Sequence, residues 1–246
     1  MDPAPVSLAS GSSPTLMWVK AITLFVLGAL LPASAFAQFR LEPRDGKFWL
    51  TGAAALTAAV ALDARLASLS QQIETPGLDR FARKVGVLGQ ARLIVPSLAL
   101  GIIVPRITGD RSMSNAGIRV AAGYFAADAL TSLLKPIIGR HRPDTLGRPG
   151  DPGRFRPLRG TSTIWRSMPS GHTTHAFALA TALSIETNKP WVTASAYSVA
   201  SLVGVQRIYT RAHWGSDVAA GAVLSMAVSA TVVRWLERSH GSLARH

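Results

Sequence analysis

The stretch Met-Pro-Ser-Gly-His-Thr-Thr-His, residues 168–175, decides how the rest of the chain is interpreted. Pro, Ser and Gly mark a turn, Ser is a favoured helix N-cap, and the apolar run 176–185 that follows predicts a helix. A helix start carries unpaired backbone N–H groups and the positive end of the helix dipole. The turn is therefore a natural seat for phosphate or another oxyanion, with the titratable His172 beside it.

Two clusters of charged residues flank this turn in the sequence. Upstream, Lys135 and Arg142 close an apolar segment with six residues between them. Downstream, Arg207 is followed after five residues by His213 and after three more by Asp217. The turn alone fits ordinary helix capping beside a surface histidine as well as it fits an anion site. The two flanking clusters favour the anion site.

Composition indicates one domain with an anionic partner. The 246 residues are 48% hydrophobic, with a mean hydropathy of +0.25, enough for one sizeable core or a small membrane bundle. The 26 Lys and Arg against 13 Asp and Glu give a net charge of +13. Such an excess favours phosphate esters, anionic lipid head groups or nucleic acid as partners. Without cysteine, disulfides and thiolate metal sites are excluded.

The N-terminal residues 1–37 predict a signal peptide. Met17 to Lys20 form a positively charged start, residues 21–31 an apolar run, and Ala35-Phe36-Ala37 a cleavage site. Residues 1–16 hold no matching element, so Met17 is a candidate for the true start. An uncleaved anchor helix is the alternative, because the apolar run is long enough to lodge in a membrane. The mature domain is then residues 38–246.

After residue 38 the sequence predicts an all-α fold. Interiors rich in Ala, Leu and Val without strict alternation favour helix over strand. Six helical segments are expected, near 47–68, 79–104, 115–134, 172–187, 190–206 and 216–237. The connection between residues 136 and 169 is long and rich in arginine, which favours a functional or partly helical segment over a linker.

The charge-free stretches are shorter than the roughly 20 residues that a membrane-spanning helix needs. If the chain started outside and all six segments crossed the membrane, the motif-bearing loops would face the cytoplasm. We therefore expect an exported bundle closely associated with the membrane, with its site facing the periplasm. A fully soluble periplasmic protein is the alternative.

Taken together, the three clusters resemble the motifs of the type-2 phosphatidic acid phosphatase (PAP2) superfamily, which includes class A acid phosphatases and vanadium haloperoxidases. The resemblance covers all three motifs in order, from Lys135 to Asp217, and implies a six-helix bundle. The position before Arg207 departs from the pattern, because it is Gln206 where the family usually has Ser. The departure puts one hydrogen bond in doubt and leaves the basic residues and histidines in place.

The resemblance also implies a role for each motif residue. His213 is the expected nucleophile that forms a phosphohistidine, Asp217 accepts its other ring N–H, and His172 protonates the leaving alkoxide. The expected phosphate-binding groups are Lys135, Arg142, Arg207, the Ser170 hydroxyl and the Gly171 N–H. These roles agree with the chemistry, because phosphoryl transfer needs positioning, fixed positive charge and N–H donors around three negative oxygens.

The leading functional hypothesis is a metal-independent phosphatase without a cofactor. Its expected substrate is a lipid phosphate or diphosphate, such as phosphatidate, phosphatidylglycerophosphate, undecaprenyl diphosphate or lipid A. A periplasmic acid phosphatase for small phosphomonoesters is the close alternative. A vanadium haloperoxidase fits less well because those chains are usually much longer. A non-catalytic basic protein has no nucleic-acid motif or stacking platform to support it.

Three other residues carry weaker signals. His172 and His175 could bind a metal with a carboxylate, although the surrounding cations oppose a divalent ion. His141 and His175 lie outside the motifs, and we expect structural roles for both. Asp128 interrupts an apolar segment, and we expect it to pair with a buried arginine.

Overall fold

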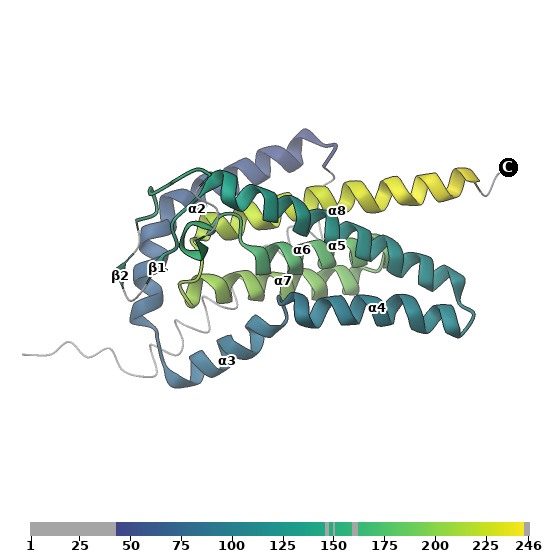
Figure 1. The fold of residues 1–246 in the computed structure, drawn as a ribbon, viewed down its shortest axis with the longest axis horizontal. Coiled ribbons are helices and arrows are strands. Elements are labelled where there is room, and N and C mark those ends of the chain that lie inside the picture. The colour runs from purple at the N-terminus through teal and green to yellow at the C-terminus, as the bar shows by residue number, and fades with distance from the viewer. Residues whose placement is uncertain (1–42, 146–147, 150, 159–161, 244–246) are drawn as a thin grey trace, which may run out of the picture.

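The computed structural model describes residues 43–145, 148–149, 151–158 and 162–243, so the predicted signal peptide lies outside the described residues. This part of the chain confirms the all-α prediction, but it contains seven α-helices, so the expected number of six was wrong. Their bounds are α2 Gly46–Gln72, α3 Pro76–Val87, α4 Ala91–Ile107, α5 Arg111–Ile138, α6 Gly171–Thr187, α7 Pro190–Tyr209 and α8 Gly215–Leu243. Figure 1 shows them as an elongated bundle.

The additional helix arises because the segment predicted at 79–104 breaks at Gly89. The axes of α3 and α4 differ by 40° across this break. A Cβ atom at Gly89 would lie 2.8 Å from Cγ1 of Val203 and 3.1 Å from the backbone oxygen of His172. Only glycine therefore allows the junction to sit this close to α6 and α7.

Helix α6 lies at the centre of the bundle, beside α5, α7 and α8 (Figure 1). Apart from Phe177, its buried side chains are all Ala or Thr, and such small side chains let neighbouring backbones approach closely. Polar groups link it to its neighbours as well. The Thr131 and Thr174 hydroxyls lie 3.0 Å apart, and Ser229 Oγ donates to the Ala178 carbonyl at 2.9 Å. The small-residue face thus places the start of α6 deep among the other helices.

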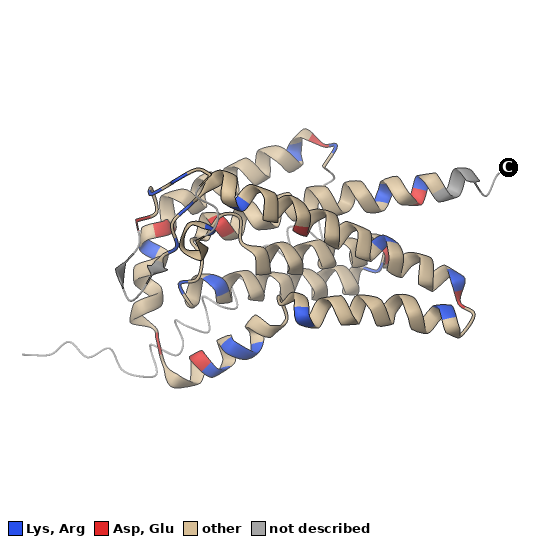
Figure 2. Ribbon diagram, viewed as in Figure 1, with Lys and Arg blue, Asp and Glu red and all other residues tan. Residues whose placement is uncertain are grey.

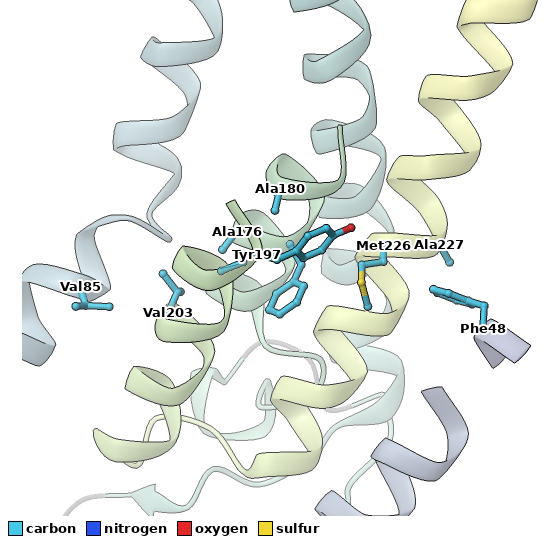
Figure 3. Packing of buried hydrophobic residues seen from close by; sticks show 10 residues of the cluster. Phe48, Val85, Ala176, Ala180, Tyr197, Val203, Met226 and Ala227 are labelled. Carbon is cyan, nitrogen blue, oxygen red and sulfur yellow. The ribbon is translucent and has the colours of Figure 1, made fainter. Parts of the chain in front are cut away.

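Two of the three clusters of buried apolar residues in the described part of the chain include residues of α6. Figure 3 shows the first, in which Phe48, Tyr197 and Met226 bring α2, α7 and α8 against α6. The second joins α4, α5, α6 and α8 through residues that include Ile94 and Tyr124. Such buried contacts supply most of the stability of helices like these.

Apolar side chains also cover much of the outer surface. Trp49, Leu50 and Leu133 are 52%, 73% and 64% exposed. Helix α2 and residues 215–239 of α8 are long and apolar enough to cross a membrane, and the bent pair α3 and α4 would make a third span if counted together. Charged residues gather toward the ends of the bundle (Figure 2). These features indicate association with a membrane.

The connection between α5 and α6 carries local structure of its own. It contains the two-residue antiparallel strands β1 (Asp144–Thr145) and β2 (Arg148–Pro149) and the short 3₁₀ helix η1 (Thr163–Trp165). Figure 1 places β1 and β2 at the end of the bundle where α6 begins. The connection therefore packs over the region in which the motif residues are expected.

Candidate active site

The start of α6 forms the floor of the site. Ser170 occupies the N-cap position and is fully buried, and its backbone N–H donates to the Asp217 carbonyl at 2.9 Å. Its hydroxyl makes no capping bond and accepts instead from the Thr173 hydroxyl at 2.9 Å. Because that contact uses the oxygen as an acceptor, the Ser170 hydroxyl proton is left for another acceptor.

Lys135 lies directly above this helix start. It belongs to the last turn of α5, and its Nζ donates to the carbonyls of Pro169 at 2.6 Å and Arg166 at 3.3 Å. A Cβ atom at Gly171 would lie 3.9 Å from that nitrogen. Burial, and then the charge of Arg142, lower the pKa of Lys135 to about 8. The ammonium group is therefore held by carbonyl groups beside the backbone of Gly171.

Two arginines add positive charge to the same region. Arg142 donates from Nε to the Thr163 carbonyl at 3.0 Å and from Nη1 to the Ala212 carbonyl at 2.7 Å. Nη1 of Arg207 lies 3.5 Å from Oε1 of Gln206, and its buried Nε has no partner among the described residues. Within the described part of the chain, neither guanidinium pairs with a carboxylate. Burial, and then Arg142, lower the pKa of Arg207 to about 10.

Gln206, the one departure from the family pattern, is buried against α3. A Cβ atom at Gly86 would lie 3.1 Å from its Nε2. The larger side chain is therefore accommodated because α3 has a glycine opposite it. Its oxygen faces Arg207, at the outer limit of a hydrogen bond.

His213 is buried in the turn that precedes α8. Its Nδ1 lies 2.8 Å from the Ser167 carbonyl and 3.6 Å from Oδ2 of Asp217. The Nδ1 proton thus goes to a backbone carbonyl, and Asp217 lies just beyond hydrogen-bond distance. Because His213 precedes α8, the spacing to Asp217 is not a helical one. This tautomer leaves the Nε2 lone pair available.

Burial lowers the pKa of His213 to about 4, with Asp217 opposing the shift and Arg142 adding to it. Its imidazole is therefore neutral at physiological pH. A neutral imidazole with a free Nε2 is the form that a nucleophile requires.

Asp217 is tied to groups that the sequence analysis did not identify. Its Oδ1 accepts from Arg140 Nη1 at 2.6 Å, and its Oδ2 accepts from Ser167 Oγ at 2.5 Å and from the Trp214 N–H at 2.9 Å. Arg140 was one of many arginines in a loop, so its type carried no signal. The one feature of the sequence that could have pointed to Arg140 is its position directly after Gly139, which ends α5 with a φ of 60°.

His172 and His175 do not face a common ligand. The ring nitrogens of His175 contact the Gly89 carbonyl at 3.0 Å and Asp128 Oδ1 at 2.8 Å, so both are engaged. Asp128 therefore pairs with a histidine, and the expected arginine partner was wrong. Burial, and then Arg207, lower the pKa of His172 to about 3. Arg207, His213 and Lys135 all act on it, which places His172 with the motif residues.

The predicted residues are thus brought to one end of the bundle by five elements, one of which is α8 with Asp217. Helix α5 supplies the lysine, the connection after it Arg142, the start of α6 His172, and the end of α7 with the following turn Arg207 and His213. Buried cations, a neutral imidazole and free helix N–H groups can together bind an anion and attack it.

Two curated proteins match parts of the chain. Over 76 residues, 30% of this chain, it is 44% identical to the lipid A 1-phosphatase of Porphyromonas gingivalis. Over 133 residues, 43% of this chain, it is 35% identical to the "Probable diacylglycerol pyrophosphate phosphatase 1" of Schizosaccharomyces pombe. The matches span 17% and 47% of the length of these relatives.

Two solved structures share the fold. LpxE from Aquifex aeolicus superposes with a TM-score of 0.55 and 26% identity over 70% of this chain and 95% of that one. A transmembrane PAP2-type phosphatidylglycerolphosphate phosphatase from Bacillus subtilis gives 0.54 and 20% identity over 89% and 96%. The family model of the PAP2 superfamily matches residues 116–240, just over half of the chain and all three motifs. The chain therefore belongs to the PAP2 superfamily.

Proposed function

We propose that the chain is a phosphatase that hydrolyses a lipid phosphate or diphosphate through a phosphohistidine on His213. The observation that carries the proposal is the set of buried cations beside a neutral histidine. Arg207 has a buried Nε with no partner among the described residues, and neither it nor Arg142 has a carboxylate partner there. Because an unpaired buried donor is costly, such a site favours a phosphate group that accepts from it.

The proposed first step is attack by the Nε2 lone pair of His213 on phosphorus. The P–O bond to the lipid alkoxide breaks, and His172, which the negative charge of the bound phosphate keeps protonated in the complex, gives that oxygen its proton. The cations and the helix N–H groups hold the three equatorial oxygens as charge spreads over them. His213 becomes positively charged, and the Ser167 carbonyl holds its Nδ1 proton beside Asp217.

In the second step His172 accepts a proton from water, and the water oxygen attacks phosphorus. The P–N bond breaks, its electron pair returns to Nε2, and inorganic phosphate leaves. His213 is neutral again and His172 is protonated again, so the cycle closes without another reactant.

An apolar groove supports a lipid as the substrate. It has a volume of about 330 Å³, lies along α6 and α7, and is lined by residues that include Leu88, Ala176, Leu183 and Val199. Ala176 follows His172 by one helical turn, so the groove begins near the proposed acid. A groove of this size and lining suits an acyl chain whose phosphate lies at the α6 start. The relatives named as lipid phosphatases support the same assignment.

The first test is phosphate release with a metal chelator present. Purified protein is given long-chain phosphatidate in detergent or p-nitrophenyl phosphate, with His213→Ala as the control. We expect preference for the lipid and loss of activity in the variant. Preference for the soluble ester would instead favour the acid phosphatase alternative. Enzyme quenched in alkali after reaction with substrate that carries a radiolabelled phosphate should hold an alkali-stable, acid-labile phosphate that His213→Ala lacks.

The groove gives a second test that separates lipid from soluble substrate. Val199→Trp places a large ring in the groove, whereas Leu100→Trp places the same ring on an exposed face of α4. The first variant should lower kcat/KM for the long-chain lipid by roughly tenfold or more and leave p-nitrophenyl phosphate unchanged. The second should change neither.

A further inference from the structure

A buried ionic cluster lies behind the proposed nucleophile. It consists of Asp63 from α2, Arg140 after α5 and Asp217 from α8, which are 1%, 2% and 0% exposed. Arg140 Nη1 lies 2.6 Å from Asp217 Oδ1, and its Nη2 lies 2.7 Å from Asp63 Oδ2. Neither Asp63 nor Arg140 belongs to the three motif sets on which the family resemblance rests.

All three guanidinium nitrogens of Arg140 are used. Besides the two carboxylates, they donate to the Pro152 carbonyl at 3.1 and 2.9 Å and to Ser216 Oγ at 2.5 Å. The guanidinium also lies over the Trp214 ring, 5.7 Å from its centroid. A lysine could supply the charge but not this planar set of donors. The geometry therefore depends on arginine.

Asp63 fixes the start of α8 from a distant part of the chain. Its Oδ1 accepts from the Ser216 N–H at 2.9 Å, and its Oδ2 accepts from the Ser216 hydroxyl at 2.6 Å. A carboxylate in this position caps the helix and favours the positive end of its dipole. Because Asp217 is the next residue, the same contact fixes the backbone position from which the Asp217 side chain extends.

A continuous set of contacts leads from Arg140 to the proposed nucleophile. Arg140 holds one oxygen of Asp217, and the other oxygen accepts from Ser167 Oγ. The carbonyl of Ser167 in turn accepts the Nδ1 proton of His213. We propose that Arg140, anchored by Asp63, is a positioning residue that fixes the Asp217 carboxylate and, through Ser167, the orientation of the His213 ring. This inference rests on the proposed role of His213.

The charges in the cluster fit this role. Two carboxylates share one guanidinium, so the cluster keeps one net negative charge beside His213. That charge favours the cationic ring that forms when His213 binds phosphorus. Without Arg140, two carboxylates would remain buried without their shared cation, and Asp217 would lose the bond that sets its direction.

The test compares Arg140→Lys and Asp63→Asn with Arg119→Gln. Arg119 forms a bidentate pair with Glu186 at 2.6 Å, between α5 and α6, and is not part of the proposed site. We expect Arg140→Lys to lower kcat by roughly 100-fold with KM within twofold, because a small misplacement of a reacting group has that effect. Asp63→Asn should show a smaller loss of the same kind. Arg119→Gln should lower thermal stability without changing kcat.

Inhibition provides a readout that a purely structural role would not change. Vanadate resembles the transition state and can bond to a correctly oriented His213 nitrogen, whereas inorganic phosphate binds through the cations. Arg140→Lys and Asp63→Asn should weaken vanadate inhibition in proportion to kcat and leave phosphate inhibition within twofold. Wild-type kcat and vanadate inhibition in both variants would overturn the inference. Should Arg140→Lys fail to fold, Asp63→Asn alone decides the question.

The proposed function fails separately from this inference. If His213→Ala kept full activity, the nucleophile itself would be wrong. If His213→Ala were inactive while Asp63→Asn and Arg140→Lys were normal, only the positioning role would be wrong.

Discussion

Arg140 and Arg142 are two residues apart, yet they have opposite surroundings. Arg140 is bound by two carboxylates, and all of its nitrogens are satisfied inside the protein. Among the described residues, the Arg142 side chain donates only to backbone carbonyls. Burial, and then the charge of Arg142, lower the pKa of the neighbouring Lys135. A satisfied cation stabilises the fold, whereas a cation without an anion is available to a ligand. The acceptors around each arginine, rather than its type, thus indicate its role.

The largest expected effect comes from His213, which lies between these two regions. His213→Ala should lower kcat at least about 10⁴-fold, because both chemical steps need its Nε2. Circular dichroism and thermal unfolding should show an intact fold. Phosphate release at the wild-type rate from this variant would rule out the proposed mechanism.

Replacing each of the two arginines by glutamine should distinguish their roles most directly. Arg142→Gln should lower kcat/KM by about 10²- to 10³-fold through loss of transition-state charge. Its thermal stability should change little, because removing the cation relieves repulsion with Lys135 and Arg207. Arg140→Gln should lose about 3 to 5 kcal/mol of unfolding free energy, because it leaves buried carboxylates unpaired.

Thermal or denaturant unfolding in detergent measures this difference, with Arg119→Gln as a reference for a partly buried pair. Equal losses of stability in Arg142→Gln and Arg140→Gln would contradict the distinction between the two regions.

The pH dependence of activity should show how the cations around His172 affect its pKa. The mechanism needs His213 neutral and His172 protonated, and in the free protein their pKa values are lowered to about 4 and about 3. A bound phosphate is negative, so it favours the protonated rings and raises both pKa values. The limbs of the kcat profile should therefore lie at higher pH than those of kcat/KM.

Arg207→Gln removes a cation that disfavours protonated His172. Because the pKa of His172 is the lower of the two, it sets the acid limb of the normalised kcat/KM profile, and that limb should move to higher pH in this variant, even though its absolute activity is lower. Identical profile shapes in variant and wild type would show that Arg207 does not act on this titration.

The smallest expected effect tests the break between α3 and α4. Gly89→Ala should cost about 1 to 3 kcal/mol and reduce activity modestly, because the added methyl meets Val203 and the backbone of His172. Gly101→Ala is the matched control in α4, where a Cβ atom would meet nothing within 4 Å. It should leave thermal stability unchanged or slightly higher. Equal behaviour of both variants would show that the close approach at Gly89 carries no strain.

Sequence alone predicted the helical class and most helix positions, because apolar periodicity and Gly or Pro punctuation are local properties. It missed the break at Gly89, whose cause is the proximity of Val203 and His172 in the folded chain. The tautomer of His213 could not be predicted from the sequence either, because it depends on the carbonyl of Ser167, 46 residues away.

The motif spacing by itself indicated the superfamily and the set of candidate site residues, since the residue types and their separations along the chain match the three motifs of that family. Only the tertiary structure decided how they are supported. Asp63 and Ser216 are 153 residues apart, and nothing local to either predicts that they bond. The cluster of Asp63, Arg140 and Asp217 exists because packing of α2 and α8 excludes water. Each buried charge therefore needs a partner of opposite sign within the protein.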